Sequence, residues 1–260
     1  MRTRRTATPV DPSLRAPRRA AALGLALAVG AGALVAGCAP AGGPAAAAVC
    51  ALTVDGERVG LDRAQAREAT ARAAARATGR PVAEPTAPQD PGASASEGAS
   101  APVDDAVVAA ILTARADEAL TCRDAPADLP VESLTATGLT PRSQAVFDGV
   151  DQAFGRVPYG GFAPGGVSTG HREGSAHYDG RAIDYFFRPV REDNLDAGWV
   201  LAQWLVARSD RLEVATVIFD DHVWTSRGSR RGWADYRTAP GASEVTRHRD
   251  HVHVDVVAGG

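Results

Sequence analysis

The sequence has no lysine, and no phenylalanine, tryptophan, tyrosine or histidine precedes Phe147. All its aromatic residues fall between Phe147 and Tyr236. Large aromatic side chains dominate burial in protein cores, so the main core is expected after about residue 140. The stretch from Phe147 to Val257, about 110 residues, is long enough for one compact domain. The absence of lysine is a feature of composition and excludes no function by itself.

The chain also lacks an excess of positive charge, since its formal net charge is −3 at pH 7. Six arginines lie between Arg2 and Arg19, against one acidic residue, Asp11. Without this basic leader the remainder is more acidic still. Nucleic-acid binding needs basic surface against phosphate, so no nucleic-acid partner is expected. The sequence contains neither a phosphate-cradling glycine loop nor a dinucleotide fingerprint, so no nucleotide partner is expected either.

Residues 1–37 are typical of an export signal: the basic leader precedes an apolar segment over 20–36. The segment ends in Leu-Val-Ala-Gly before Cys38, which resembles a bacterial lipobox. Cys38 is therefore the expected lipidation site, residues 38–49 the tether, and the cell membrane outside the cytoplasm the expected location. The alternatives are an ordinary signal peptide, or a single membrane anchor in which Cys38 is incidental.

Cysteine is scarce, with three in the whole chain. If Cys38 carries lipid, Cys50 and Cys122 remain, and two cysteines in an exported chain are expected to form a disulfide. Such a bond would contribute on the order of 4 kcal/mol in the chain-entropy view.

Residues 50–125 are expected to form a small, mostly helical accessory module. A hairpin over 51–60 turns at an Asp-Gly pair, a helix covers 61–78, and a second helix covers about 105–120 with Asp104 as its N-cap. Residues 80–102 are rich in Pro, Ala, Ser and Gly and predict a low-complexity insertion. The preferred role is a spacer above the membrane; the alternative is recognition of the cell wall.

Residues 140–257 predict an α+β domain with a small antiparallel sheet and flanking helices. Helices are expected from Pro141 to about Phe154 and over 193–212. Strands are expected over 182–187, 214–219, 223–226 and about 252–257.

Two short segments of this domain carry residues suited to a metal. His177 and Asp184 are seven apart, and Gly180 between them permits a turn that brings both to one ion. His251 and His253 are two apart, so a strand places both on one face. Two imidazoles and one carboxylate with an open fourth position form a common ligand set for catalytic zinc.

These segments also resemble a known superfamily. The pattern Ser-x-His-x-x-Gly-x-Ala-x-Asp from Ser175 to Asp184 is similar to that of the zinc D-Ala-D-Ala peptidases, which belong with lysostaphin and hedgehog proteins. Asp250-His-Val-His253 resembles the second motif of that group, and the chain is similar in kind to exported actinobacterial proteins that end in Asp-His-Val-His-Val. The resemblance covers about residues 140–257.

The resemblance implies one zinc ion per chain, held by His177, Asp184 and His253. Asp250 would be the general base that takes a proton from the attacking water and passes it to the leaving amine. His251 would stabilise the oxyanion or replace Asp250 as base.

Arg172 stands where relatives hold a substrate carboxylate or carbonyl, and His171 replaces their usual tyrosine. His222 and His248 have no motif support, so a surface position or a position behind the ligands is expected for both. Trp224 is expected in the core or lining a groove.

Two classes of function follow. The first is an exported zinc peptidase that cuts peptidoglycan stem peptides, as a D-Ala-D-Ala carboxypeptidase or an endopeptidase, with wall peptides and the membrane as partners. The second is a catalytically silent lipoprotein that binds or handles zinc. The complete motif around Asp250 favours the enzyme.

Overall fold

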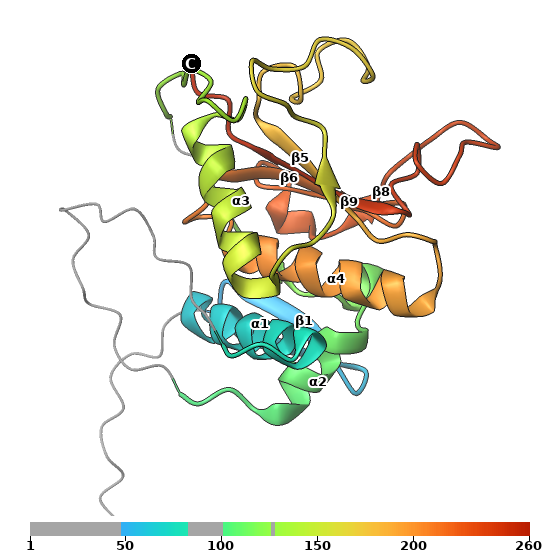
Figure 1. Cartoon of the computed structure of the whole chain (residues 1–260). Coiled ribbons are helices and arrows are strands. Elements are labelled where there is room, and N and C mark those ends of the chain that lie inside the picture. The colour runs from blue at the N-terminus through green and yellow to red at the C-terminus, as the bar shows by residue number, and fades with distance from the viewer. Residues whose placement is uncertain (1–47, 83–100, 126–127) are drawn as a thin grey trace, which may run out of the picture. The chain divides into compact units, whose positions relative to one another are not determined.

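The computed structural model describes residues 48–82, 101–125 and 128–260, which all belong to one compact unit, Pro44–Gly260 (Figure 1). The predicted signal segment, Cys38 and nearly all of the tether lie outside the described residues, as does most of the insertion expected over 80–102. Among the described helices, none combines the length and apolar character that crossing a bilayer requires.

The first sheet is built around the predicted hairpin. Its order is β2-β1-β3, with β1 at Cys50–Val54, β2 at Glu57–Leu61 and β3 at Thr121–Cys122, all antiparallel. Both turn residues, Asp55 and Gly56, have positive φ angles (49° and 81°), as a tight hairpin turn requires. Cys50 lies opposite Cys122, and the two form the predicted disulfide.

Two helices follow this hairpin. Helix α1 (Arg63–Thr78) begins with a capping box in which the Asp62 side chain accepts a hydrogen bond from the backbone of Gln65 and the Gln65 side chain accepts one from Asp62. Helix α2 (Asp105–Thr113) begins at the expected cap, Asp104.

Helix α2 ends earlier than expected, because the chain turns away after Thr113 and forms only a short 3₁₀ helix, η1, at Ala116–Glu118. The buried side chain of Gln203 holds this segment. Its Nε2 donates to the carbonyl of Ile111 at 2.9 Å, and its Oε1 accepts from the amide of Leu120 at 2.9 Å. The hydrophobic pattern alone continues through this break, which is why it predicts a longer helix.

The second sheet has six antiparallel strands in the order β4-β5-β9-β6-β7-β8. The last strand in the chain, β9, lies in the middle, between β5 and β6. The strands are β4 Tyr159–Gly160, β5 Ala182–Phe186, β6 Val214–Phe219, β7 His222–Thr225, β8 Ala234–Asp235 and β9 His251–Val256. With the helices and both sheets, the described part of the chain is α+β, as predicted.

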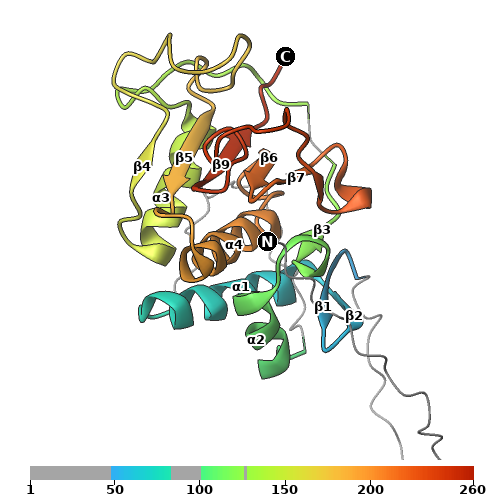
Figure 2. The same cartoon turned by 90° about the vertical axis from the view of Figure 1, so that its right-hand side faces the viewer.

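Helix α3 (Pro141–Phe154) flanks this sheet, and helix α4 (Glu192–Ala207) lies between the sheet and helix α1 (Figures 1 and 2). Helix α4 ends five residues before the expected end, and its C-cap Arg208 turns toward α1. The guanidinium of Arg208 donates to Thr70 Oγ1 at 2.9 Å and to the carbonyl of Arg67 at 3.1 Å. A second 3₁₀ helix, η2, covers Ser229–Arg231.

The core extends beyond the region that the aromatic residues predict. One cluster of buried side chains joins Trp199 and Trp204 of α4 to Leu52 of β1 and Ile111 of α2. The alanine-rich face of α1 lets α1 and α4 approach closely, because small side chains occupy little space. The expectation that the core lies after residue 140 is therefore wrong in extent, although it locates the large aromatic side chains.

Candidate metal centre

The middle of the second sheet brings two of the predicted ligands together. Asp184 of β5 and His253 of β9 are direct cross-strand partners, so their side chains lie on the same face of the sheet. His177 comes from the turn that leads into β5. This turn closes at Gly180, which has a φ of +66° and lies against Gly138, leaving no room for a Cβ. The expected turn at Gly180 is thus present.

The three predicted ligand atoms converge. Nε2 of His177 lies 3.1 Å from Nδ1 of His253 and 3.3 Å from Oδ1 of Asp184, and Nδ1 of His253 lies 3.0 Å from the same oxygen. All three side chains are buried, at 2%, 8% and 9% exposure for His177, Asp184 and His253. Three atoms from three chain segments therefore share one small space.

Contacts on the far side of each imidazole favour one position for the ring proton. Nδ1 of His177 lies 2.9 Å from the carbonyl of Gly161, to which only a protonated nitrogen can donate. Nε2 of His253 lies 3.4 Å from Oδ2 of Asp255. Both contacts favour the tautomers that leave the facing nitrogens unprotonated. In these tautomers two nitrogen lone pairs and a carboxylate oxygen point at one another, so the cluster needs positive charge between them, from a metal ion or, in its absence, from a proton.

The proton affinities of the group agree with a site for positive charge. Burial alone would raise the pKa of Asp184, but hydrogen bonds from His177 and His253 outweigh it and hold that pKa well below its usual value. Burial alone would lower the pKa of His253, yet Asp184 and Asp255 raise it to about 9. A proton on His253 thus occupies the space when no metal is bound.

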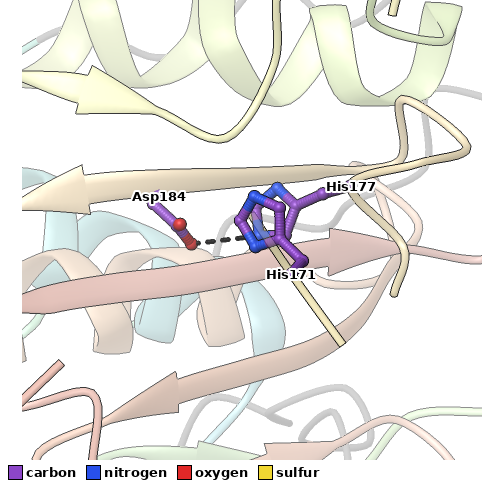
Figure 3. A group of neighbouring side chains, drawn as sticks. All are labelled: His171, His177 and Asp184. Atoms are coloured by element: carbon purple, nitrogen blue, oxygen red, sulfur yellow. Dashed lines mark ion pairs between the residues drawn. The ribbon is translucent and has the colours of Figure 1, made fainter. Parts of the chain in front are cut away.

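A third histidine, His171, lies beside this cluster. Metal-binding atoms of His171, His177 and Asp184 all lie within 4.8 Å of one another, so this trio could hold a metal ion. The rings of His171 and His177 are stacked, with centroids 3.9 Å apart, and Figure 3 shows both beside Asp184. The hydroxyl of Tyr178 bonds to the backbone carbonyl and amide of His171 and fixes this loop.

Sequence reasoning treats His171 only as a replacement for tyrosine and assigns Tyr178 no role. The one available signal was the imidazole itself, six residues before His177. Burial, and then the neighbouring His177, lower the pKa of His171, which favours the neutral form that a metal ligand needs. Two sets of three possible ligands therefore exist, and both contain His177 and Asp184. The third member is His171 in one set and His253 in the other.

Asp250 and His251 form a hydrogen-bonded pair at the edge of the cluster. Nδ1 of His251 lies 2.7 Å from Oδ1 of Asp250, and Nε of Arg188 donates to Oδ2 at 2.6 Å. Both carboxylate oxygens of Asp250 are therefore engaged. Burial raises the pKa of Asp250, but hydrogen bonds from His251 and Arg188 lower it below its usual value. Nε2 of His251 lies 3.8 Å from Oδ1 of Asp184, on the side of the predicted ligands. Sequence reasoning missed Arg188.

The other candidates occupy different environments. Trp224 is fully buried in the core, one of the two positions expected for it. Arg172 is exposed and forms no ion pair within the described part of the chain.

The two histidines without motif support lie at different places. The ring of His222 packs against that of Trp199, with ring centroids 5.8 Å apart. His248 has a positive φ of 53° and a buried Nδ1 that finds no partner among the described residues; its ring centre lies 4.7 Å from that of His251.

A family model described as VldE, C-terminal domain, matches residues 135–249, less than half of the chain. The matched range contains His171, His177 and Asp184 and ends one residue before Asp250, so it excludes His251 and His253. No curated protein and no solved structure matches the chain. Over residues 135–249 this chain is therefore similar to the C-terminal domain of the VldE family, and within that stretch it carries a buried His-His-Asp group that could hold a metal.

Proposed function

We propose that this chain is an exported zinc peptidase that hydrolyses peptidoglycan stem peptides. One observation carries the proposal: three buried ligand atoms of His177, Asp184 and His253 converge within 3.3 Å of one another, beside an imidazole held by a carboxylate. Nitrogen and carboxylate ligands in this number suit a catalytic zinc. The resemblance of the two motifs to the zinc D-Ala-D-Ala peptidases supports the choice of reaction and substrate.

Zinc bound at these residues would supply a Lewis acid and lower the pKa of a coordinated water to about 7. The residues around it would handle the proton. Asp250 holds Nδ1–H of His251 and so leaves Nε2 of His251 free to accept a proton. We therefore assign the general base to His251, with Asp250 and Arg188 as positioning residues. This reverses the roles that the motif alone suggests for Asp250 and His251.

Arg172 belongs to the same proposal as a substrate-binding residue. It adjoins His171 on the loop beside the cluster, and its exposed guanidinium has no ion-pair partner among the described residues. A guanidinium binds a carboxylate through two parallel hydrogen bonds, and the C-terminal carboxylate of a stem peptide is such a group. A preference for substrates with a free C-terminus would support this role.

The Cys50–Cys122 disulfide supports the extracytoplasmic location, because disulfides persist in oxidising compartments. Anchoring through lipid on Cys38 and contact with the wall belong to the proposal as well. A lipid anchor would hold the enzyme at the membrane, near newly exported wall precursors. Mass spectrometry of the mature N-terminus checks the lipidation.

One observation favours the second candidate, a zinc-binding protein without turnover. His171 lies close enough to join His177 and Asp184 around one ion. With His253 it would make four protein ligands, and a closed set of four is typical of structural zinc rather than catalytic zinc. Displacement of His171 by water or substrate would reopen the site.

The test is incubation of zinc-loaded protein with purified wall fragments, read by mass spectrometry for released D-alanine or cleaved cross-links. Wild type is compared with His251→Ala and with His222→Ala, a matched histidine outside the cluster. Cleavage lost only in His251→Ala supports the peptidase. If wild type binds zinc stoichiometrically yet cuts none of a broad panel of wall peptides, the silent zinc-binding function replaces it.

A further inference from the structure

An open pocket of about 390 Å³ lies where the first sheet meets η2, and none of the metal-site residues lines it. Its walls come from β1 and β2, from the segment around β3, and from η2 with the glycine that follows it. Four arginines line it: Arg58, Arg123, Arg230 and Arg231. No acidic side chain is among its lining residues.

These four arginines lack the partners that surround other arginines here. Within the residues that the structure describes, none of the four forms an ion pair. Arg58 has one described side-chain hydrogen bond, from Nη1 to the carbonyl of Asp117 at 3.2 Å. By contrast, Arg67 and Arg115 each bind a carboxylate at 2.6 Å. In a chain of net charge −3, four uncompensated positive charges around one pocket create a local field that attracts anions.

A second observation points to a ligand. Oγ1 of Thr121, which lines the pocket, is buried and has no hydrogen-bond partner among the described residues. A buried hydroxyl without a partner is costly, and such groups are uncommon in folded proteins. The hydroxyl is covered in the ligand-free structure, so a ligand with acceptor oxygens would satisfy it, as well as the guanidinium groups, once the covering side chains move aside.

Covalent and hydrogen-bond contacts hold the backbone around the pocket. The Cys50–Cys122 disulfide and the cross-strand pair Ala51–Thr121 fix one wall. Oγ of Ser229 donates to the carbonyl of Asp124 at 3.0 Å and accepts from its amide at 2.8 Å, which fixes η2 against the segment after β3. A site that is already ordered loses less conformational entropy on binding.

We propose that this pocket binds a phosphate group. Planar guanidinium groups recognise phosphate oxygens through paired, charge-assisted hydrogen bonds, and hydroxyls donate to the same oxygens. Two sources share this chemistry: a phospholipid headgroup and a soluble phosphate or phosphate ester. Ala48 at the pocket lies ten residues after Cys38, the predicted lipid attachment site. Ten residues span at most about 35 Å, so a lipid anchor would keep headgroups within reach.

The first experiment measures inorganic phosphate binding to residues 44–260, the compact unit, by calorimetry. The double variant Arg230→Gln/Arg231→Gln removes two exposed guanidiniums, and Thr121→Val removes the hydroxyl at nearly constant shape. Arg156→Gln is the matched control, since Arg156 is exposed and does not line the pocket. Thermal unfolding of each variant checks that it remains folded.

We expect saturable binding by wild type and by Arg156→Gln, and an affinity at least about tenfold weaker in the double variant, because two charged hydrogen-bond donors are lost. Thr121→Val is expected to weaken binding less. Absence of saturable binding by wild type overturns the proposal, and so does equal affinity of wild type and a folded double variant.

The second experiment distinguishes the sources with vesicles of phosphatidylglycerol and of phosphatidylcholine. Binding to the anionic vesicles that the double variant loses identifies a lipid headgroup. Phosphate binding without any preference for anionic vesicles identifies a soluble phosphate. Either result retains the phosphate site, and neither depends on the metal centre.

Discussion

The imidazole of His251 is hydrogen-bonded to the carboxylate of Asp250, with Nδ1 and Oδ1 2.7 Å apart. The other ring nitrogen of His251, Nε2, faces Asp184. The same carboxylate binds Arg188 with its other oxygen. Of the two residues that the motif offers as a base, His251 is therefore the one whose free nitrogen lies on the side of the predicted ligands.

The first prediction concerns this pair. If the proposed peptidase activity holds, His251→Ala should lower turnover of stem peptides by about 10²–10⁴-fold, because the proposed general base is removed. Asp250→Asn should lower it less and shift the pH profile, since the base remains but loses its partner. Both are assayed as D-alanine release at equal zinc content. If Asp250→Asn is inactive while His251→Ala keeps turnover, Asp250 is the base.

The second prediction concerns Gly161, whose carbonyl holds His177. A Cβ at Gly161 would lie 2.4 Å from the imidazole of His177, and its φ is +87°. Gly161→Ala should weaken zinc affinity by about 10–100-fold, the usual effect of disturbing a group that orients a ligand. Gly165→Ala is the control, because Gly165 has a similar φ of +82° and nothing within 4 Å of a Cβ. Competition with a chromophoric chelator measures both, and equal losses in the two variants would show backbone strain alone.

The third prediction separates the two trios of ligands. His177→Ala and His253→Ala should lose stoichiometric zinc, because each removes one of three converging atoms. His171→Ala should retain one zinc ion, with weaker binding if His171 is a fourth ligand. The absorption spectrum of cobalt-substituted protein reports the coordination number. Full zinc binding by His253→Ala together with its loss in His171→Ala would assign the site to His171, His177 and Asp184.

The fourth prediction follows from the raised pKa of His253, about 9 in the metal-free protein. Protonated His253 stabilises the fold below its unfolded pKa of about 6.5, and this stabilisation is lost as the pH rises through 9. The free energy of unfolding without metal should therefore fall between about pH 6.5 and 9.5, by at most about 3 kcal/mol. Urea unfolding measures it. In Asp184→Asn, which lacks the main partner of His253, this dependence should flatten.

The fifth prediction concerns Gln203. Gln203→Met keeps the volume of the side chain but leaves the amide of Leu120 and the carbonyl of Ile111 without their partner. Each unsatisfied buried group costs about 1–3 kcal/mol, so the free energy of unfolding should fall by at least about 2 kcal/mol. Gln152→Met, at an exposed position of α3, should change it little. Urea unfolding at fixed pH measures both.

Local patterns in the sequence predicted the local structure well. The Asp-Gly turn, the cap at Asp104, the start of a helix at Pro141 and the Cys50–Cys122 disulfide are all present, although the N-cap residue Thr140 makes no capping hydrogen bond through its side chain. The three residues that the motifs single out, His177, Asp184 and His253, also lie together, and their role as ligands stays a prediction. Alternating strands and cap residues act over a few positions, so one sequence suffices to read them.

Contacts between distant segments were not predictable in this way. The side chain of Gln203 binds the last turn of helix α2, some ninety residues earlier in the chain. Arg188, which follows strand β5, donates a hydrogen bond to Asp250, which precedes strand β9. The approach of His171 to His177 depends on how the loop that carries His171 folds back onto the sheet. The core shared by α1 and α4 depends on how these two helices pack against each other. None of these contacts has a periodic signature, because each depends on the final packing.

The place of β9 has a consequence for how the protein forms. Strand β9 is made after every other described strand, yet it lies between β5 and β6 and supplies His253. A nascent chain that emerges from its N-terminus holds two separate half-sheets until residues 251–256 arrive. Insertion of one strand then joins the halves and completes the cluster in the same step. His253 can therefore join His177 and Asp184 only after nearly the whole chain has been made.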